Sequence, residues 1–395
     1  MKLNSNSQDY KILIALCLVV IGTMSLNDIL LPSLPAITVS LHTKTAVIQQ
    51  SLALFLIGQA ASIFICGPIS DIWGRKNTML ASLYFTLIVS VFFIFVNSIE
   101  TYLYLKFLQG LGSGSGIALG RIIMVDYFKN KSLIKIASIF SMAALISPLI
   151  MPSIGGYIQE IYGWRTNFVI SCINLSVIII IFNFLCVETN LQKIQPNIKE
   201  LLNNYKIVIT DKKFICWTLL NSSCVAGYYS YVTVSPFLFQ NFYKFSPLEF
   251  GYICAIITSA NFIGKSLLIT MSHKIKNYLI AIASAIASAI TLTLIGCYLY
   301  ILSTSAYDAV LLLFIFMLVL GVATPTMGTQ ALARFDKIRG VAGALFSTIT
   351  LTITAISCNI VGILPDRGLN LPGLTFIVLG ALSIVVVSIL AKSDN

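Results

Sequence analysis

The sequence predicts an all-α polytopic membrane protein. Of its 395 residues, 57% are hydrophobic and only 10% are charged. Soluble domains carry about 25% charged residues, so no soluble core could bury this much apolar surface and the solvent must be lipid. The second observation is a series of apolar runs, each near the ~20 residues that a helix needs to cross a membrane. Most of these runs are separated by short polar turns, as in a helical bundle.

Twelve such runs follow one another along the chain. They cover residues 12–34, 46–69, 77–97, 102–126, 134–158, 166–187, 214–240, 247–272, 277–301, 308–333, 340–363 and 371–391. Only the connection at 188–213 is both long and polar. The sequence therefore predicts an N-terminal six-helix bundle (1–187), a linker (188–213) and a C-terminal six-helix bundle (214–395).

The basic residues predict the orientation of these spans. With a cytoplasmic N-terminus, 18 of the 25 Lys and Arg fall in inside segments and three (Lys106, Arg121, Lys265) within spans. The outside loops then hold only Lys44, Arg165, Lys244 and Arg367. Because cytoplasmic loops carry the excess of Lys and Arg, both termini and the 188–213 linker are expected in the cytoplasm. Topology explains the net charge of +11, which removes the reason to expect a nucleic-acid partner.

Enzyme, metal and cofactor chemistry find little support in the sequence. The chain has only two histidines, His42 and His273, both at span ends, and its nine cysteines form no CxxC pair. There is no nucleotide-binding motif after a strand, so ATP does not supply the energy and an ion gradient must. We expect no cofactor, no metal and no enzyme activity; a polytopic membrane enzyme is the alternative from another class.

The short loop "GPISDIWGRK" at 67–76 joins the second and third spans. The positive-inside rule explains Arg75 and Lys76, and a tight turn explains the Pro and Gly. Neither explains Asp71. An acid and two bases at fixed spacing can pair with neighbouring helix ends and re-pair when helices move; a solvated loop with incidental charges is the alternative.

This loop resembles the "GxxxDRxGRR" motif of the major facilitator superfamily of secondary transporters. Further stretches are similar to its Bcr/CflA-type multidrug efflux transporters, which are drug–proton antiporters. In chain order these stretches are "LNDILLPSLPAI" (26–37), "LKFLQGLGSGSGIALGRIIMVDYF" (105–128), "SPLIMPSIGGYI" (147–158), "YVTVSPFLFQNFYKFSPLEFG" (231–251) and "RGVAGALFS" (339–347). The chain departs from the family at Ile72, where Arg is usual, and at Lys106, which replaces an Arg.

The resemblance implies two sets of structural residues. A conformational gate is expected at the inner ends of the helices, with Asp126 as its third charged member; it comprises Gly67, Asp71, Gly74, Arg75, Lys76 and Asp126. The fifth span carries a helix-kinking motif associated with exporters, made of Pro148, Pro152, Gly155 and Gly156.

Charges within the spans are functional candidates, because placing them in lipid is costly. Asp28 and Lys106 lie at similar predicted depths, so we expect them to face each other across a cavity. Asp28 is then the coupling-proton carrier and Lys106 tunes it, or the two form a static pair. Lys265 is expected to snorkel to the membrane surface. Arg121 either pairs with Asp126 or lines the cavity.

Polar and aromatic residues on two spans predict the ligand contacts. The predicted substrate-binding residues are Asn27, Asp28, Gln109, Ser113, Tyr228, Tyr231 and Phe239. Tyr228, Tyr231 and Phe239 share one face of the seventh span at helical spacing. Such a face suits a cavity with aromatic walls; a packed seam between helices is the alternative.

Together these features predict a proton-coupled secondary exporter of small amphipathic drugs or metabolites, working by alternating access. Its partners would be the small-molecule substrate, protons and the lipid bilayer, and we expect a monomer. The location would be the bacterial inner membrane. The alternatives within transport are a proton-coupled uptake symporter for a nutrient and an exporter dedicated to one metabolite, such as a siderophore.

Overall fold

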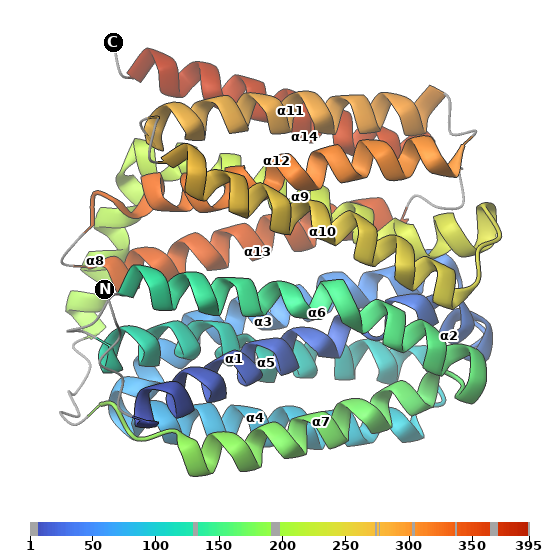
Figure 1. The fold of residues 1–395 in the computed structure, drawn as a ribbon, viewed down its shortest axis with the longest axis horizontal. Helices are drawn as coiled ribbons and strands as arrows, with labels where there is room; N and C mark the ends of the chain where they lie inside the picture. Colours follow the sequence, from blue (N-terminus) through green and yellow to red (C-terminus); the bar gives the residue numbers. More distant parts are fainter. Residues whose placement is uncertain are drawn as a thin grey trace.

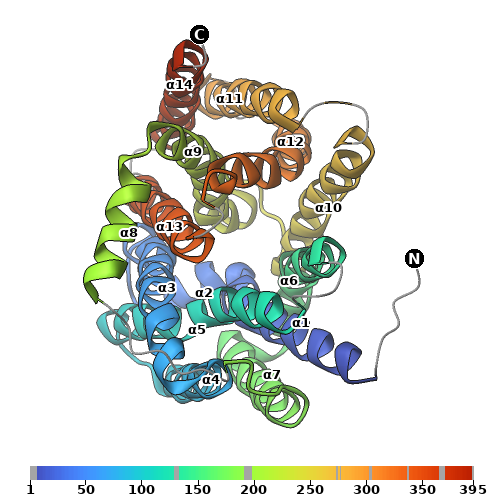
Figure 2. The same cartoon turned by 90° about the vertical axis from the view of Figure 1, so that its left-hand side faces the viewer.

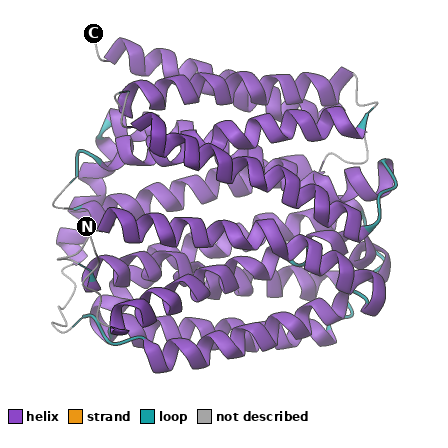
Figure 3. Cartoon of the chain, viewed as in Figure 1, coloured by secondary structure: helices purple, strands orange, loops and turns teal. Residues whose placement is uncertain are grey.

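The computed structural model describes residues 7–128, 133–190, 198–272, 275, 277–301, 305–335, 338–363 and 370–393. Lys129, Lys131, His273 and Arg367 lie outside these residues. The described part is helical throughout and contains no strand (Figure 3). This confirms the predicted all-α class.

Six long helices make up the N-terminal bundle. They are α1 (Ser7–Asp28), α3 (Thr45–Trp73), α4 (Arg75–Phe92), α5 (Ile99–Tyr127), α6 (Leu133–Tyr162) and α7 (Trp164–Leu185). Short turns extend two of them. A 3₁₀ turn at Leu31–Ser33 and the short helix α2 (Leu34–Ser40) continue α1, and a 3₁₀ turn at Phe93–Phe95 ends α4.

Six more long helices form the C-terminal bundle. They are α9 (Lys212–Phe237), α10 (Pro247–Ser272), α11 (Asn277–Ile301), α12 (Ala306–Leu332), α13 (Arg339–Ile363) and α14 (Asn370–Ser393). A π-helical turn at Leu238–Phe242 prolongs α9. The linker contains a helix that the sequence did not predict, α8 (Ile198–Thr210). Both chain termini and α8 lie at the same end of the helices, here called the terminal end; α2 lies at the opposite, distal end (Figure 1).

Local chemistry explains the sharpest helix boundaries. Pro32 and Pro35, each in the first turn of the next segment, follow the end of α1; proline lacks the N–H that a continuing helix needs. Gly74 separates α3 from α4 with a φ of 99°, and Gly163 separates α6 from α7 with a φ of 80°. Only glycine adopts this region without strain, so each allows two long helices to meet with no intervening loop.

Ten helical segments of the described chain are long and apolar enough to cross a membrane. The two long helices that do not meet this standard are α5 and α9, and both bury several polar side chains. Figure 2 places both toward the middle of the helix assembly. Helices surrounded by other helices need less apolar surface than helices that face lipid, which explains why these two are more polar.

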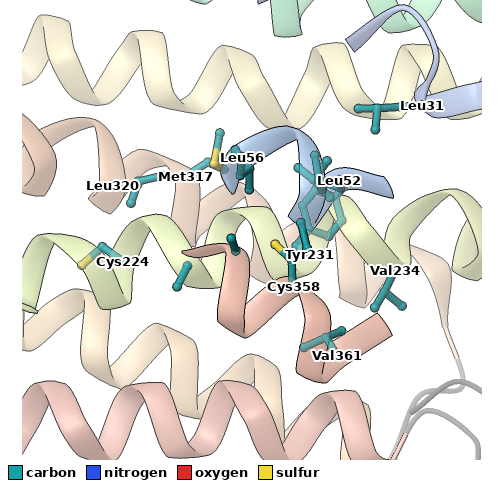
Figure 4. Packing of buried hydrophobic residues seen from close by; sticks show 14 of the residues in the cluster. Leu31, Leu52, Leu56, Cys224, Tyr231, Val234, Met317, Leu320, Cys358 and Val361 are labelled. Carbon is teal, nitrogen blue, oxygen red and sulfur yellow. The ribbon is translucent and has the colours of Figure 1, made fainter. Parts of the chain in front are cut away.

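The two bundles meet through α3 against α13 and α6 against α10. Part of the buried core crosses this interface: Figure 4 shows Leu52 and Leu56 of α3 with Tyr231 of α9 and Cys358 of α13. Toward the distal end the contacts are direct. Gln240 Nε2 donates to the carbonyl of Pro32 at 2.9 Å, and Leu248 N donates to Glu160 Oε1 at 2.9 Å.

The space around individual glycines shows how tightly the two bundles pack at each end of the helices. A Cβ on Gly156 would overlap the backbone of Pro247, and one on Gly251 would overlap the backbone of Ser153. Both of these crossings join α6 to α10 near the distal end. In contrast, a Cβ on Gly67, Gly340 or Gly343 would meet no atom within 4 Å, and these residues lie toward the terminal ends of α3 and α13. The bundles therefore pack closely at the distal end and more openly at the terminal end.

Candidate functional site

A cavity of about 210 Å³ lies between the two bundles. Helices α1, α3 and α6 line it from the N-terminal side, and α9, α10 and α12 from the C-terminal side. Its lining residues are Met24, Asn27, Asp28, Phe55, Gln59, Ala144, Leu145, Pro148, Tyr228, Tyr229, Thr258, Asn261, Lys265, Met317 and Leu320. The mixture of apolar walls with a few polar groups is typical of a small-molecule site.

Asp28 is the acid of this cavity. It is the last residue of α1, immediately before the proline-containing turns. Its Oδ2 accepts a hydrogen bond from Ser147 Oγ on α6 at 2.6 Å, while Oδ1 has no donor among the described residues. Tyr228 and Tyr229, whose rings meet edge to face at 5.1 Å, line the same cavity. One carboxylate oxygen is thus held in place and the other is available to a ligand or a proton.

Lys106 does not lie opposite Asp28. It is 2% exposed, inside the N-terminal bundle, and its Nζ donates to Gln109 Oε1 at 3.1 Å. The rings of Phe55, Phe93 and Phe168 surround the ammonium, with centroids 5.4, 5.5 and 5.9 Å away. No ion pair within 4.0 Å joins Lys106 to Asp28. The expected pairing across a cavity is therefore absent from this structure, because α5 turns Lys106 toward these rings, where cation–π attraction stabilises the charge.

Gln109 and Ser113 are also inside the N-terminal bundle rather than in the cavity wall. Gln109 Nε2 donates to Ser90 Oγ at 3.0 Å. Ser113 Oγ accepts from Gln59 Nε2 at 3.4 Å. Since Gln59 itself lines the cavity, Ser113 is one residue removed from it. The sequence placed these residues on the correct helix but could not tell which neighbouring helix they face.

The three aromatic residues predicted to form one face of α9 lie in different surroundings in the structure. Tyr228 lines the central cavity. Tyr231 is buried in the apolar core (Figure 4) and borders a separate pocket of about 20 Å³ within the C-terminal bundle. Phe239 is fully buried and packs against the rings of Tyr243, Phe245 and Phe250. Two of the three aromatic residues thus lie in a packed seam, outside the central cavity.

Lys265 reaches the central cavity, contrary to the expected snorkelling. It lies on α10, is half-buried and belongs to the cavity lining. Other lining residues that the sequence analysis did not single out are Gln59, Tyr229, Thr258 and Asn261. The rule that marks intramembrane charges as functional would have identified Lys265. No comparable signal marks the four neutral residues.

The predicted gate charges come together at the terminal end of the N-terminal bundle. Arg75 contacts Asp71 at 2.6 Å and Asp126 at 3.3 Å, measured between guanidinium nitrogens and carboxylate oxygens. Its guanidinium also donates to Ser70 Oγ and to the carbonyl of Gly67 at 3.5 Å. Lys76 Nζ donates to the carbonyl of Asn183 on α7 at 2.7 Å. All of these groups belong to one bundle, so in this structure they do not join the two halves.

Glu188, at the start of the linker, is a gate contact that the sequence analysis missed. Its carboxylate accepts from the backbone N–H groups of Arg75 at 2.8 Å and Lys76 at 3.2 Å. These N–H groups begin α4 and have no partner within the helix, so an acid there caps it and meets its positive end. Asn190 Nδ2 adds a bond to the carbonyl of Asp71 at 2.9 Å. The linker is thereby tied directly to the gate loop.

The proline and glycine motif of the fifth span lies within α6, as expected for Pro148, Pro152, Gly155 and Gly156. A Cβ on Gly155 would overlap the carbonyl oxygen of Ile29 on the α1 side, and Gly156 makes the crossing with α10. Pro148 lines the cavity, and its carbonyl accepts from Thr258 Oγ1 at 3.3 Å. The motif permits α6 to touch both bundles closely.

Residues 15–357 match the family model of the Major Facilitator Superfamily. The chain belongs to this superfamily of membrane transporters. It is 26% identical over 266 residues to the multidrug transporter MdfA of Yersinia pestis, covering 67% of this chain and 65% of the relative. It is also 26% identical over 228 residues to the bicyclomycin resistance protein homolog of Haemophilus influenzae, covering 57% of each.

The fold of the chain also matches that of a solved transporter structure. The crystal structure of the D-xylose–proton symporter superimposes with a TM-score of 0.78 over 95% of this chain and 97% of that chain. At 14% identity this likeness shows the fold alone. The predicted two-bundle architecture and the predicted membership of the superfamily are confirmed. The chain is a multi-pass membrane transporter.

Proposed function

We propose that this transporter is a proton-coupled exporter of small amphipathic compounds that works by alternating access. The observation that carries the proposal is Asp28, a carboxylate with one free oxygen in a cavity between the two bundles. A single acid in that position can hold either a proton or the cationic group of a ligand. Likeness to relatives named as multidrug and bicyclomycin-resistance transporters supports an amphipathic substrate.

In this proposal Asp28 exchanges its two occupants as the cavity opens to one side and then to the other. A poorly hydrated site favours the neutral carboxyl, and contact with water or a cation favours the carboxylate. Lys106, held in the ring cage formed by Phe55, Phe93 and Phe168, acts as a positive charge that shifts the balance between the neutral and ionised forms of Asp28. Lys106 does not line the cavity and makes no ion pair with Asp28, which supports an influence through the electric field rather than direct pairing.

With the topology proposed from the basic residues, the structure corresponds to a state in which the cavity opens toward the cytoplasm. The terminal end, with both termini and the 188–213 linker, would be cytoplasmic, in a bacterial inner membrane. The bundles (1–187 and 214–395) pack closely at the distal end through Gly156 and Gly251. We propose that the charges at Asp71, Arg75 and Asp126 re-pair with the C-terminal bundle when the terminal end closes. The working unit is a monomer, since the cavity is formed within one chain.

Direction and coupling are tested in everted membrane vesicles energised by respiration. The vesicles should accumulate a fluorescent amphipathic cation such as ethidium, and a protonophore should release it. Asp28→Asn should remove accumulation, while Glu100→Gln, an exposed acid outside the cavity, should not. Accumulation only in right-side-out vesicles would overturn export in favour of proton-coupled uptake.

A further inference from the structure

Lys265 carries a charge that the mechanism above does not use. It lies in the cavity wall on α10, and its ammonium has no hydrogen-bond or ion-pair acceptor among the described residues. A charge at such depth is costly unless it has a partner or a function. Snorkelling, the usual alternative, does not account for a side chain that lines the central cavity.

The surroundings of Lys265 offer no acid to neutralise it. Arg121 of α5 lies close enough to interact with it electrostatically, which adds a second positive charge. Arg121 is itself exposed and makes no ion pair with a described acid. Asp28 lines the same cavity but is not within 4.0 Å of Lys265. The cavity therefore presents an open carboxylate on the N-terminal bundle and an open ammonium on the C-terminal bundle.

The contacts of α10 indicate how far apart these charges lie. Thr258 Oγ1 bonds to the carbonyl of Pro148, whose neighbour Ser147 bonds to Asp28. Thr258 thus marks the level of Asp28 on α10. Lys265 is seven residues further along the helix, or about 10 Å at 1.5 Å per residue, toward the terminal end. A ligand that contacts both charges must separate its own charges by several bonds.

We propose that Asp28 and Lys265 bind the two ends of a zwitterionic ligand whose ammonium and carboxylate are separated by a chain or a ring. This inference rests on the proposed function and names the substrate class of that same site. The ligand's ammonium meets Asp28, and its carboxylate meets Lys265. Because each bundle supplies one charge, only such a ligand links the two halves electrostatically across the cavity.

The size and walls of the cavity agree with this class. Its volume of about 210 Å³ lies near the lower end of small-molecule pockets, which begin at about 300 Å³, so a compact ligand fills the cavity in this structure. The aromatic lining residues Phe55, Tyr228 and Tyr229 offer ring faces to a bound cation or an aromatic spacer. Amide side chains of Asn27, Gln59 and Asn261 supply neutral hydrogen-bonding groups.

Calorimetric titration of the purified transporter with unbranched amino acids, from glycine to ω-aminooctanoic acid, tests the proposal. Affinity should rise with chain length as the charges become able to span the cavity. The methyl ester and the N-acetyl derivative of ω-aminooctanoic acid each lose one charge, so each should bind about tenfold more weakly, as expected for one charge-assisted hydrogen bond.

Variants assign each charge to its residue. Lys265→Gln should abolish the preference for the acid over its methyl ester, and Lys265→Arg should retain most of it. Lys206→Gln removes an exposed lysine of α8, outside the cavity, and should leave the preference unchanged. Equal weakening of acid and ester by Lys265→Gln would overturn the proposal, as would the absence of binding across the whole series.

Binding to the purified transporter and ethidium accumulation in everted vesicles together separate this inference from the proposed function. Proton-driven ethidium accumulation without any preference for the acid would overturn only the zwitterion assignment. Selective binding of ω-aminooctanoic acid without proton-driven transport would overturn the coupling mechanism and leave the ligand assignment standing.

Discussion

The two bundles share one architecture but use different polar chemistry. The N-terminal bundle combines neutral contacts, such as Gln109 with Ser90, with charged ones: Lys106 among three aromatic rings, and Arg75 between Asp71 and Asp126. In the described interior of the C-terminal bundle the polar contacts are mostly neutral, such as Ser230 with Ser357 at 2.8 Å and Ser223 with Ser383 at 2.7 Å. Lys265 is the exception, and it lines the shared cavity.

This difference suggests that the two bundles have different roles in transport. Charged groups change their interactions strongly with hydration and proton binding, whereas hydroxyl pairs change little. The N-terminal bundle would therefore respond to protons and to gate movement, and the C-terminal bundle would supply a more constant wall. If so, removing charged groups from the first bundle should impair transport, and removing the hydroxyl pairs from the second should mainly affect stability.

The largest effect is expected at Asp28. Asp28→Asn keeps the side chain's shape and its bond with Ser147 but cannot exchange a proton. Substrate-induced proton release from purified protein in detergent should disappear. Lys106→Arg should retain release but shift its pH dependence, since an arginine stays charged where a buried lysine can lose its proton.

Undiminished proton release from Asp28→Asn would contradict the assignment and move attention to Asp126. An unchanged pH dependence in Lys106→Arg would indicate that Lys106 is a structural cation within its cage. Either result would weaken the view that the N-terminal bundle responds to protons.

A smaller effect is expected at the gate. Asp71→Asn leaves Asp126 as the remaining carboxylate partner of Arg75. Because the Asp71 side chain is 45% exposed, its pair contributes no more than about 1 kcal/mol to stability. Transport should fall several-fold while ligand affinity stays near the wild-type value, as measured by flux in proteoliposomes and by direct binding.

Glu100→Gln provides the matched control, because it removes an exposed acid at the opposite end of the same bundle. Wild-type flux in a well-inserted Asp71→Asn variant would show that the gate charges are ordinary surface pairs. A loss of ligand affinity equal to the loss of flux would place the effect in the cavity instead.

A third test compares two tyrosines on one helix. Tyr228 lines the central cavity and Tyr231 borders the apolar pocket of the C-terminal bundle. Tyr228→Ala should weaken binding of aromatic cations by about tenfold through lost ring contacts. Tyr231→Ala should lower thermal stability in detergent and leave ligand affinity nearly unchanged.

Equal effects of the two substitutions on every ligand would show that the cavity wall extends further into the C-terminal bundle than the structure indicates. Tyr231 was itself predicted from the sequence as a ligand contact, so this pair also tests the sequence-based assignment against the structural one.

The sequence predicted the elements of this fold more reliably than their neighbours. Hydropathy located the long helices, and the charged loop located Asp71 and Arg75, because both signals are local. The ring cage around Lys106 requires residues from α3, α4 and α7 to converge, counting the turn that ends α4. Helical spacing gives the face of a residue on its own helix but not the helix that this face meets.

Two further features could not be predicted from the sequence, for related reasons. The linker helix α8 has too few residues and too many charges for a span, and it packs on the N-terminal bundle through the stacking of Tyr205 on Phe64 of α3 at 5.1 Å. Glu188 caps α4 from more than 100 residues away in sequence. Contacts of this kind depend on the tertiary arrangement of helices, which the periodicity of one segment does not contain.

The smallest effect is expected from the hydroxyl pairs of the C-terminal bundle. Ser230→Ala removes one bond between α9 and α13 and leaves Ser357 free to bond elsewhere. Interhelical hydrogen bonds within membranes contribute about 0.6 kcal/mol on average, so unfolding in detergent should change only slightly and transport should persist. The double variant Ser230→Ala/Ser357→Ala completes a cycle whose coupling energy measures the pair itself. Loss of transport in Ser230→Ala, with stability intact, would mean that this neutral seam rearranges during the transport cycle. The C-terminal bundle would then be as much a moving part as its charged counterpart.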